Sequence, residues 1–264
     1  MNNNLLFSRR KFLKISLMGL CAACLPGCLA KATTGADFIQ TNHNRLMDDF
    51  DQFFDFVRKP ADVVYGSQET SAIIAESRRG YENILPEIPY IGGDDNSLTG
   101  VLFLSAGALV FYRVMLKHGY SLAETGRILF QAMERSAENA DPLSGADARL
   151  ANGKAAQNEF RRLAGQLTRS PYPGDWKATF IEGDGVNFDY GIDYTTCGIV
   201  KFYQSQNASE LAPYLCLGDF PTSIVMNTGL VRTSTLACGG SCCDFRFKAG
   251  RPVRMEWTPD FLKK

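Results

Sequence analysis

The sequence feature that most constrains the fold is the run of residues 101–116, which is apolar almost all round. A helix with this composition is either buried in the centre of a domain or crosses a membrane. Arg113 and Lys117 limit the uninterrupted run to less than the roughly 20 residues that a membrane span needs. The run therefore predicts a buried core helix around which the rest of the chain packs.

Other helices are expected on both sides of this core helix. An amphipathic helix is predicted over residues 40–58 and is expected to end at Pro60, since apolar residues recur there at helical spacing. Those residues are Leu46, Phe50, Phe53, Phe54 and Val57. Ser121 and Glu124 form the pattern of a capping box at the start of another helix. The remaining expected helices span residues 68–84, 121–138 and 145–168.

The pattern changes from helix to strand after Trp176. Residues 177–182 and 186–194 alternate as two strands do, and the glycines around Asp184 supply a turn between them. A helical segment broken near Asn207 and a second pair of strands are expected next, over residues 196–217, 230–237 and 242–248. We therefore expect an α+β fold, with an N-terminal helical half packed against a C-terminal mixed half that contains a small antiparallel sheet. Residues 28–264 are expected to form a single domain.

The charge balance indicates a small partner. The chain has 28 basic and 28 acidic residues, but residues 1–27 contribute four basic residues and no acid. The remainder therefore has a net charge of −4, from 24 basic and 28 acidic residues. A nucleic-acid-binding protein needs a clustered basic surface, so nucleic acid is not expected as a partner.

The first 27 residues have the pattern of a signal peptide for twin-arginine export. Arg9 and Arg10 lie in the motif S-R-R-K-F-L-K, and the apolar stretch 15–25 follows. The alternative is a membrane anchor or an accidental basic start, but the stretch is shorter than a membrane span. The motif L-P-G-C resembles a lipobox that would make Cys28 the lipidated first residue. We therefore expect a periplasmic or cell-envelope protein whose partners include the translocation machinery, with membrane contact only through Cys28.

Five cysteines follow Cys28, and all lie beyond residue 196. They are Cys197, Cys216, Cys238, Cys242 and Cys243. Because the number is odd, they cannot all pair within one chain. A disulfide that includes Cys238 is one alternative, and a soft metal held by the last three is another. Since the spacing lacks the paired C-x-x-C motifs of a structural zinc site, we expect no metal and no other cofactor.

Cys197 is the candidate nucleophile. It follows two threonines where a helix is expected to start, and the positive end of a helix lowers the pKa of a thiol. Asp189 and Asp193 share one face of the preceding strand, so both carboxylates are expected to face the same cavity as Cys197. This set suits a nucleophile with a carboxylate general base. The alternative is a small buried cysteine beside solvated acids.

Two further groups stand near the C-terminus. Cys216 and Asp219 are three residues apart and are expected to share a helix face. In the closing strand, alternation separates an inward set from an outward set. The inward set, which resembles core, is Cys243, Phe245 and Phe247, and the outward set is Cys242, Asp244 and Arg246.

Four longer sequence blocks, which occur in order along nearly the whole mature chain, match the sequence pattern of one known protein family. They are Y-E-N-I-L-P-E-I-P-Y-I-G-G from Tyr81, F-D-Y-G-I-D-Y-T-T-C-G-I-V-K-F-Y from Phe188, A-P-Y-L-C-L-G-D-F from Ala212 and L-V-R-T-S-T-L-A-C-G-G-S-C-C-D-F-R-F from Leu230. The chain resembles the L-2-amino-thiazoline-4-carboxylic acid hydrolase family in these blocks. The resemblance implies hydrolytic opening of the thiazoline ring to N-carbamoyl-cysteine.

The resemblance also implies a set of site residues. They are Asp189, Asp193, Cys197, Cys216, Asp219, Arg232, Cys243, Asp244 and Arg246. Either Cys197 attacks the ring carbon between sulfur and nitrogen, or a carboxylate such as Asp193 activates a water. Substrate binding is expected from Asp219 and Asp244, and from Arg232 or Arg246, whose guanidinium suits a carboxylate. Cys216 and Cys243 are expected as secondary or structural thiols.

The chain departs from the family pattern on both sides of Cys197. Thr196 stands where an acidic residue is usual, and Val200 stands where a second cysteine is usual. The alternative function is therefore a non-catalytic periplasmic module of the same fold that binds or senses a small molecule.

Overall fold

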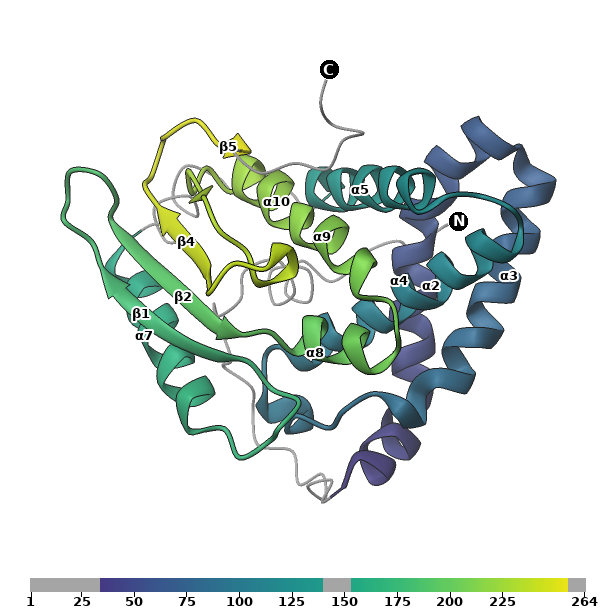
Figure 1. The fold of residues 1–264 in the computed structure, drawn as a ribbon, viewed down its shortest axis with the longest axis horizontal. Helices are drawn as coiled ribbons and strands as arrows, with labels where there is room; N and C mark the ends of the chain where they lie inside the picture. Colours follow the sequence, from purple (N-terminus) through teal and green to yellow (C-terminus); the bar gives the residue numbers. More distant parts are fainter. Residues whose placement is uncertain (1–33, 140–152, 256–264) are drawn as a thin grey trace, which may run out of the picture.

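The computed structural model describes residues 34–139 and 153–255 (Figure 1). The predicted signal peptide and Cys28 lie outside the described residues. The N-terminal half is helical, as expected, but the helix predicted over residues 145–168 begins only at Lys154, because Gly153 before it is extended. The long helices are α2 (Gly35–Tyr65), α3 (Ser67–Ile84), α4 (Thr99–Lys117), α5 (Leu122–Asn139) and α7 (Lys154–Arg169).

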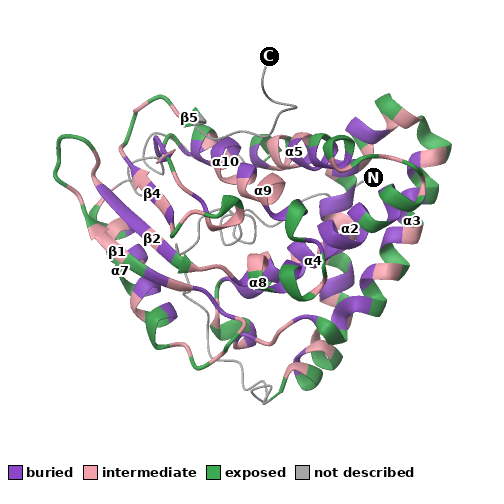
Figure 2. Ribbon diagram, viewed as in Figure 1, coloured by how far each residue is buried: buried purple, intermediate pink, exposed green. Residues whose placement is uncertain are grey.

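Helix α4 is the core helix that the apolar run predicts. It is long and apolar enough to cross a membrane, but 72% of its most apolar stretch is buried inside the protein. It packs against α2, α3, α5 and the short helix α8 (Gly198–Ser205). Figure 2 shows buried residues along its ribbon, among the helices of the N-terminal half. The helix therefore organises the core of the described chain.

The prediction that Pro60 ends the first helix is wrong. Helix α2 continues through Pro60 to Tyr65, and the N–H of Gly66 still donates to the carbonyl of Asp62 at 3.0 Å. Proline removes one helical hydrogen bond, but Pro60 and Ala61 are both buried against neighbouring elements. Tertiary packing offsets the local cost at this position.

The capping box before α5 is confirmed. The N–H of Ser121 donates to the Glu124 carboxylate at 2.8 Å, and the N–H of Glu124 lies 3.3 Å from the Ser121 hydroxyl. Gly119 precedes it with a φ of 87°, which suits a residue without a side chain. These contacts turn the chain from α4 into α5.

The C-terminal half contains a five-stranded sheet. Its strands are β1 (Lys177–Glu182), β2 (Tyr190–Thr196), β3 (Val231–Arg232), β4 (Cys243–Phe247) and β5 (Arg254–Met255), in the order β1-β2-β4-β3-β5. All neighbours are antiparallel except β3 and β5. Helix α7 packs against β1. The expected α+β fold is confirmed.

The second strand pair is shorter than predicted. Strand β3 pairs with β4 only through Val231 and Arg246. The chain then leaves the sheet because the N–H groups of Thr233 and Ser234 donate to the Asp244 carboxylate at 2.9 and 2.6 Å. A 3₁₀ turn, Leu236–Cys238, follows. A polar side chain thus takes the place of most of the expected ladder, of which the bond from the Asp244 N–H to the Ser234 carbonyl, at 3.4 Å, remains.

The helical segment between β2 and β3 is broken at Asn207, as predicted, where φ is 54°. It is less regular than expected and continues past Leu217 to Val225. Its parts are α8, the 3₁₀ turns Ser209–Leu211 and Cys216–Gly218, and the helices α9 (Ala212–Leu215) and α10 (Asp219–Val225). One hydrophobic core joins these parts to the sheet and the N-terminal helices.

Candidate active site

A cavity of about 240 Å³ lies between the N-terminal helices and one face of the sheet. We call this sheet face the inner face; it consists of Tyr190, Ile192 and Tyr194 of β2 and Cys243, Phe245 and Phe247 of β4. Helices α2, α4, α5 and α10 supply most of the remaining wall. The lining is mainly apolar, and its charged members among the described residues are Asp49 and Asp219.

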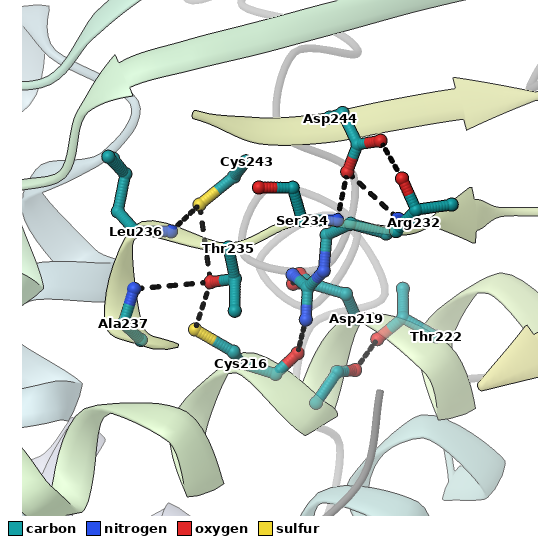
Figure 3. Close-up of polar contacts among 12 residues, drawn as sticks. Cys216, Asp219, Thr222, Arg232, Ser234, Thr235, Leu236, Ala237, Cys243 and Asp244 are labelled. Carbon is teal, nitrogen blue, oxygen red and sulfur yellow. Dashed lines mark hydrogen bonds and ion pairs between the residues drawn. The ribbon is translucent and has the colours of Figure 1, made fainter. Parts of the chain in front are cut away.

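Asp219 is held at the cavity wall by Arg232. The guanidinium donates from Nη1 to Asp219 Oδ2 at 2.7 Å and from Nη2 to the Cys216 carbonyl at 2.8 Å (Figure 3). Arg232 is 2% exposed and lies over the rings of Phe220 and Phe245, 5.2 and 5.0 Å from their centroids. The pair is thus buried behind the cavity with its carboxylate on the cavity side.

The environment of Asp219 acts on its pKa in two directions. Loss of solvent raises the pKa, whereas the charge and hydrogen bond of Arg232 lower it, and the net direction is upward. The side chain is surrounded by protein, but 34% of its surface remains accessible because it lines the cavity. A carboxylate with a raised pKa and access to a cavity is suited to accept a proton.

Two thiols lie beside this ion pair. Thr235 bridges them, with its Oγ1 at 3.6 Å from Cys216 Sγ and 3.4 Å from Cys243 Sγ (Figure 3). The Leu236 N–H also donates to Cys243 Sγ at 3.3 Å. Burial raises the pKa of Cys216, although the positive charge of Arg232 acts in the opposite direction. Cys216 is therefore held as a neutral thiol.

Cys197 stands immediately before α8, as predicted, but the expected fall in its pKa is wrong. Burial raises the pKa of Cys197 to about 11, and the N–H groups of Val200 and Ile199 and the indole of Trp176 only reduce the rise. Gly198 permits this packing, because a Cβ there would lie 2.5 Å from Cζ3 of Trp176. Loss of solvent outweighs the effect of an eight-residue helix.

The other predicted residues lie on the opposite, outer face of the sheet. Asp193 accepts a hydrogen bond from Arg246 Nη1 at 2.6 Å, and Asp189 accepts one from the N–H of Ala249 at 3.0 Å. The prediction that Asp189 and Asp193 face the cavity with Cys197 is therefore wrong. The alternation was correct, but the helices cover the aromatic face, since burying it gives the larger hydrophobic gain.

Arg246 and Asp244 have structural contacts on this outer face. Gly191 lies opposite Arg246, and a Cβ there would come within 3.0 Å of the Arg246 side chain, so glycine leaves room for the guanidinium. Asp244 binds the backbone after β3, with an additional contact of 2.5 Å from the Thr233 hydroxyl. Neither Arg246 nor Asp244 lines the cavity.

The five cysteines among the described residues form no disulfide with one another. Within residues 34–139 and 153–255, no three His, Cys, Asp or Glu side chains lie in positions that could hold a metal ion. Cys238 is exposed, and Cys242 is half-buried near Asp193 and Asp244. The thiols are therefore divided between the cavity side and the outer side of the sheet.

The structure brings together five of the predicted site residues around Tyr194. Cys197, Cys243 and Asp219 all lie near enough to Tyr194 to raise its pKa, and burial raises it further. Arg232 and Cys216 complete the group through Asp219 and Thr235. We call these five residues and Tyr194 the Asp219 cluster.

Sequence reasoning missed three residues of this region. Thr235 lies within the block that begins at Leu230, but a threonine between two thiols carries no signal of its own. Tyr194 is one of two tyrosines in its strand, and nothing in the sequence marks it for a polar role. Asp49 could have been found, because it lies four residues before Phe53 and so shares the apolar face of a predicted amphipathic helix.

A comparison with protein families gives one match. The chain matches the family model described as L-2-amino-thiazoline-4-carboxylic acid hydrolase over residues 103–247, which is more than half of its 264 residues. The match includes every member of the Asp219 cluster. Comparisons with curated proteins and with solved structures found no match. On the extent of this match, the chain belongs to the L-2-amino-thiazoline-4-carboxylic acid hydrolase family.

Proposed function

We propose that the protein is a hydrolase that opens a small cyclic amidine ring, of the thiazoline type, in the cavity. The observation that carries the proposal is the Asp219–Arg232 pair, because it places a carboxylate on the cavity wall and holds it there from behind. Membership of the hydrolase family supports the same class of reaction. The proposal requires no metal or other cofactor.

The mechanism assigns proton transfer to Asp219. A water molecule adds to the ring carbon between sulfur and nitrogen, and Asp219 accepts a proton from that water. The carbon–sulfur bond then breaks, and the sulfur leaves and takes up a proton to form the thiol of the ring-opened product. Arg232 acts as a positioning residue, since it fixes the carboxylate and favours its charged form.

The route through a covalent Cys197 adduct is less favoured by the geometry. A nucleophilic thiol must lose its proton, and the pKa of Cys197 is about 11. Asp193, the base first expected for this route, contacts Arg246 on the outer face instead. We therefore assign the base to Asp219 and give Cys197 a place in the buried support of the cluster.

A non-catalytic binding or sensing module of the same fold is the second candidate. The observation that favours it is the loss of solvent around the half-buried Cys197 and Cys216, which raises the pKa of both thiols. Thiols of this kind are unreactive, and the mainly apolar cavity would then only hold a ligand.

Export is the second part of the proposal. We place the mature protein in the periplasm or cell envelope, after twin-arginine transport and with a lipid on Cys28. The support is the motif at Arg9 and Arg10 and the lipobox-like sequence before Cys28. Replacing both arginines by lysine is expected to retain the protein in the cytoplasm. Cys28→Ala is expected to release it from the membrane fraction, and neither variant should change activity in vitro.

The test of the enzyme uses the mature chain with two variants, Asp219→Asn and Cys197→Ser. Each is incubated under reducing conditions with L-2-amino-thiazoline-4-carboxylate and with unsubstituted 2-amino-thiazoline, and ring-opened N-carbamoyl thiols are measured by mass spectrometry. The wild type and Cys197→Ser are expected to open a ring, and Asp219→Asn to lose about 10²-fold or more in rate. The wild-type rate is expected to fall at low pH, as Asp219 becomes protonated.

Other outcomes would change the assignment. A loss of activity in Cys197→Ser with retention in Asp219→Asn would establish the covalent route. If the wild type opens neither ring, the hydrolase proposal fails and the binding module takes its place.

A further inference from the structure

We infer that Tyr81 is a ligand-binding residue, whose phenol donates a hydrogen bond to a neutral acceptor, such as a carbonyl, on an apolar ligand in the cavity. The inference concerns the part of the wall where α2, α3 and α4 meet, and it does not depend on hydrolysis at Asp219. Tyr81 lies outside residues 103–247, which match the family model, so membership of the family assigns it no role.

Tyr81 reaches the cavity from a helix that otherwise lies behind the wall. Helix α3 packs against α2 and α4 on the outer side of the helical half, away from the sheet (Figure 1). Among the described residues that line the cavity, Tyr81 is the single member of α3. Because the backbone of α3 lies behind α2 and α4, the end of the Tyr81 side chain, which carries the hydroxyl, is the part that meets the cavity.

The hydroxyl of Tyr81 has no hydrogen-bond partner among the described residues, although Tyr81 is only 2% exposed. The side-chain polar atoms of the described residues that are both fully enclosed and without a partner are Arg45 Nε, Asp62 Oδ1 and Thr70 Oγ1. The hydroxyl of Tyr81 is therefore not enclosed, and it opens to the cavity. A buried hydroxyl without a protein partner costs stability, so it is retained where it has another task, such as binding a ligand.

The ring of Tyr81 is held in place by aromatic stacking. It lies on the ring of Phe50 at 4.8 Å between centroids, with an angle of 25° between the planes. Phe50 in turn stacks on Phe54 at 3.9 Å. Gly107 of α4 makes room for this stack, because a Cβ there would lie 3.2 Å from Cδ2 of Phe50. A ligand therefore meets a phenol whose position is fixed before binding, which lowers the entropic cost of the contact.

The state of the phenol and the character of the wall decide the ligand class. Burial raises the pKa of Tyr81, and the charge of Asp49 acts in the same direction, so the hydroxyl keeps its proton at neutral pH. Leu46, Phe53 and Phe103 line the cavity from α2 and α4. In such an apolar space an uncharged acceptor costs less to desolvate than an ion. The ligand class is therefore an apolar molecule that carries a neutral acceptor.

The cavity is larger than a single small ring. A volume of roughly 150 Å³ is enough to hold benzene in a protein interior. The cavity has about 240 Å³, and its lining runs along α2 from Leu46 to Phe56. Ten residues of a helix span roughly 15 Å. The space therefore extends along α2 beyond the size of one ring and leaves room for a ligand at Tyr81.

The test uses two probes of nearly equal shape, acetophenone and α-methylstyrene, which has a methylene group in place of the carbonyl oxygen. Their affinities for the wild-type mature protein, Tyr81→Phe and Tyr203→Phe are measured by NMR titration. Tyr81→Phe is expected to bind acetophenone about fivefold more weakly than the wild type, because one hydrogen bond is lost. Its affinity for α-methylstyrene is expected to change by less than about twofold. Tyr203→Phe is expected to keep both affinities, since Tyr203 does not line the cavity.

Thermal unfolding without a probe separates a binding role from a structural one. Tyr203 is 0% exposed, and its hydroxyl donates to the Ser105 carbonyl at 2.7 Å. Tyr203→Phe is therefore expected to lower Tm by about 2 °C or more. Tyr81→Phe removes a hydroxyl that has no partner among the described residues, and is expected to lower Tm by less than about 1 °C. A larger loss, or a failure to fold, would show that the Tyr81 hydroxyl has a structural role and would overturn the inference.

Two further results contradict the inference. One is that neither probe binds to the wild type, and the other is that Tyr81→Phe weakens both probes equally or neither of them. None of these measurements involves turnover. Failure of the hydrolase proposal therefore leaves this inference standing, and failure of this inference leaves the hydrolase proposal untouched.

Discussion

Strands β2 and β4 have two faces of opposite character, built from alternate residues of the same segments. The inner face is aromatic and lines the cavity, with Tyr194 and Phe245 in edge contact at 5.5 Å between ring centroids. The outer face is polar and joins Asp193 to Arg246 in an ion pair. The face that carries most of the charged residues of these strands is therefore not the face that meets the cavity.

This difference shows how the charges reach the cavity. The inner face is covered because burial of aromatic surface stabilises the fold. The cavity then receives its charged groups from other elements, Asp219 from α10 and Asp49 from α2. Strand β3 supplies Arg232, which reaches Asp219 from behind. The charged side chains of the cavity region therefore come from elements that surround the apolar inner face, not from that face itself.

The largest expected effect is a difference in stability between two variants, one without the guanidinium of the Asp219–Arg232 pair and one without that of the Asp193–Arg246 pair. Arg232→Met is expected to lower the free energy of unfolding by about 2–4 kcal/mol, because the guanidinium, which is 2% exposed, no longer donates to the Asp219 carboxylate and the Cys216 carbonyl behind the cavity wall. Arg246→Met is expected to cost less than about 1 kcal/mol, since Arg246 and Asp193 are each about one quarter exposed. Urea denaturation measures both. Equal losses would mean that the two faces contribute alike.

The sequence predicted the helical elements well where apolar spacing decides them. The predicted helix over residues 68–84 corresponds to Ser67–Ile84, and the apolar run 101–116 lies within Thr99–Lys117. Pro60 was misjudged because burial by distant elements offset a local preference. Local patterns therefore predict elements, and packing decides where some of them end.

The candidate site was predictable only in part. Alternation placed Asp189 and Asp193 on one face correctly, but periodicity does not say which face meets the helices. The contact between Asp219 and Arg232 joins two residues separated by the turn after α10, and no spacing rule reports it. The family resemblance singled out both residues without showing that they touch. Their pairing follows from the tertiary structure alone.

The second expected effect is a difference in alkylation rate between Cys197, on the cavity side, and the exposed Cys238. At pH 8, alkylation of Cys197 in the native protein is expected to be at least about tenfold slower than in the unfolded protein, because its pKa is raised to about 11 and only the thiolate reacts. The exposed Cys238 serves as the comparison. Peptide mapping by mass spectrometry gives both rates.

The pH dependence of this reaction follows from the same shift. The native rate at Cys197 is expected to keep rising with pH toward 11, since the thiolate fraction increases until pH passes the pKa. If Cys197 reacts as fast as Cys238 at pH 8, its thiolate is favoured in the native state. The covalent mechanism would then replace the one assigned to Asp219.

The smallest expected effect is a difference in stability between variants of two threonines that flank Ser234. Thr233 contacts Asp244, whereas Thr235 contacts the thiols of Cys216 and Cys243. Thr235 is buried, accepts a hydrogen bond from the Ala237 N–H at 3.3 Å and contacts two thiols, so Thr235→Val is expected to cost about 1 kcal/mol of stability. Thr233 is exposed and donates to Asp244, which keeps its bonds from two backbone N–H groups. Thr233→Val is therefore expected to cost less than about 0.5 kcal/mol. Thermal unfolding of the two isosteric variants measures the difference. A larger loss at Thr233 would show that the turn after β3 is held by the outer carboxylate more than by the buried thiol contacts.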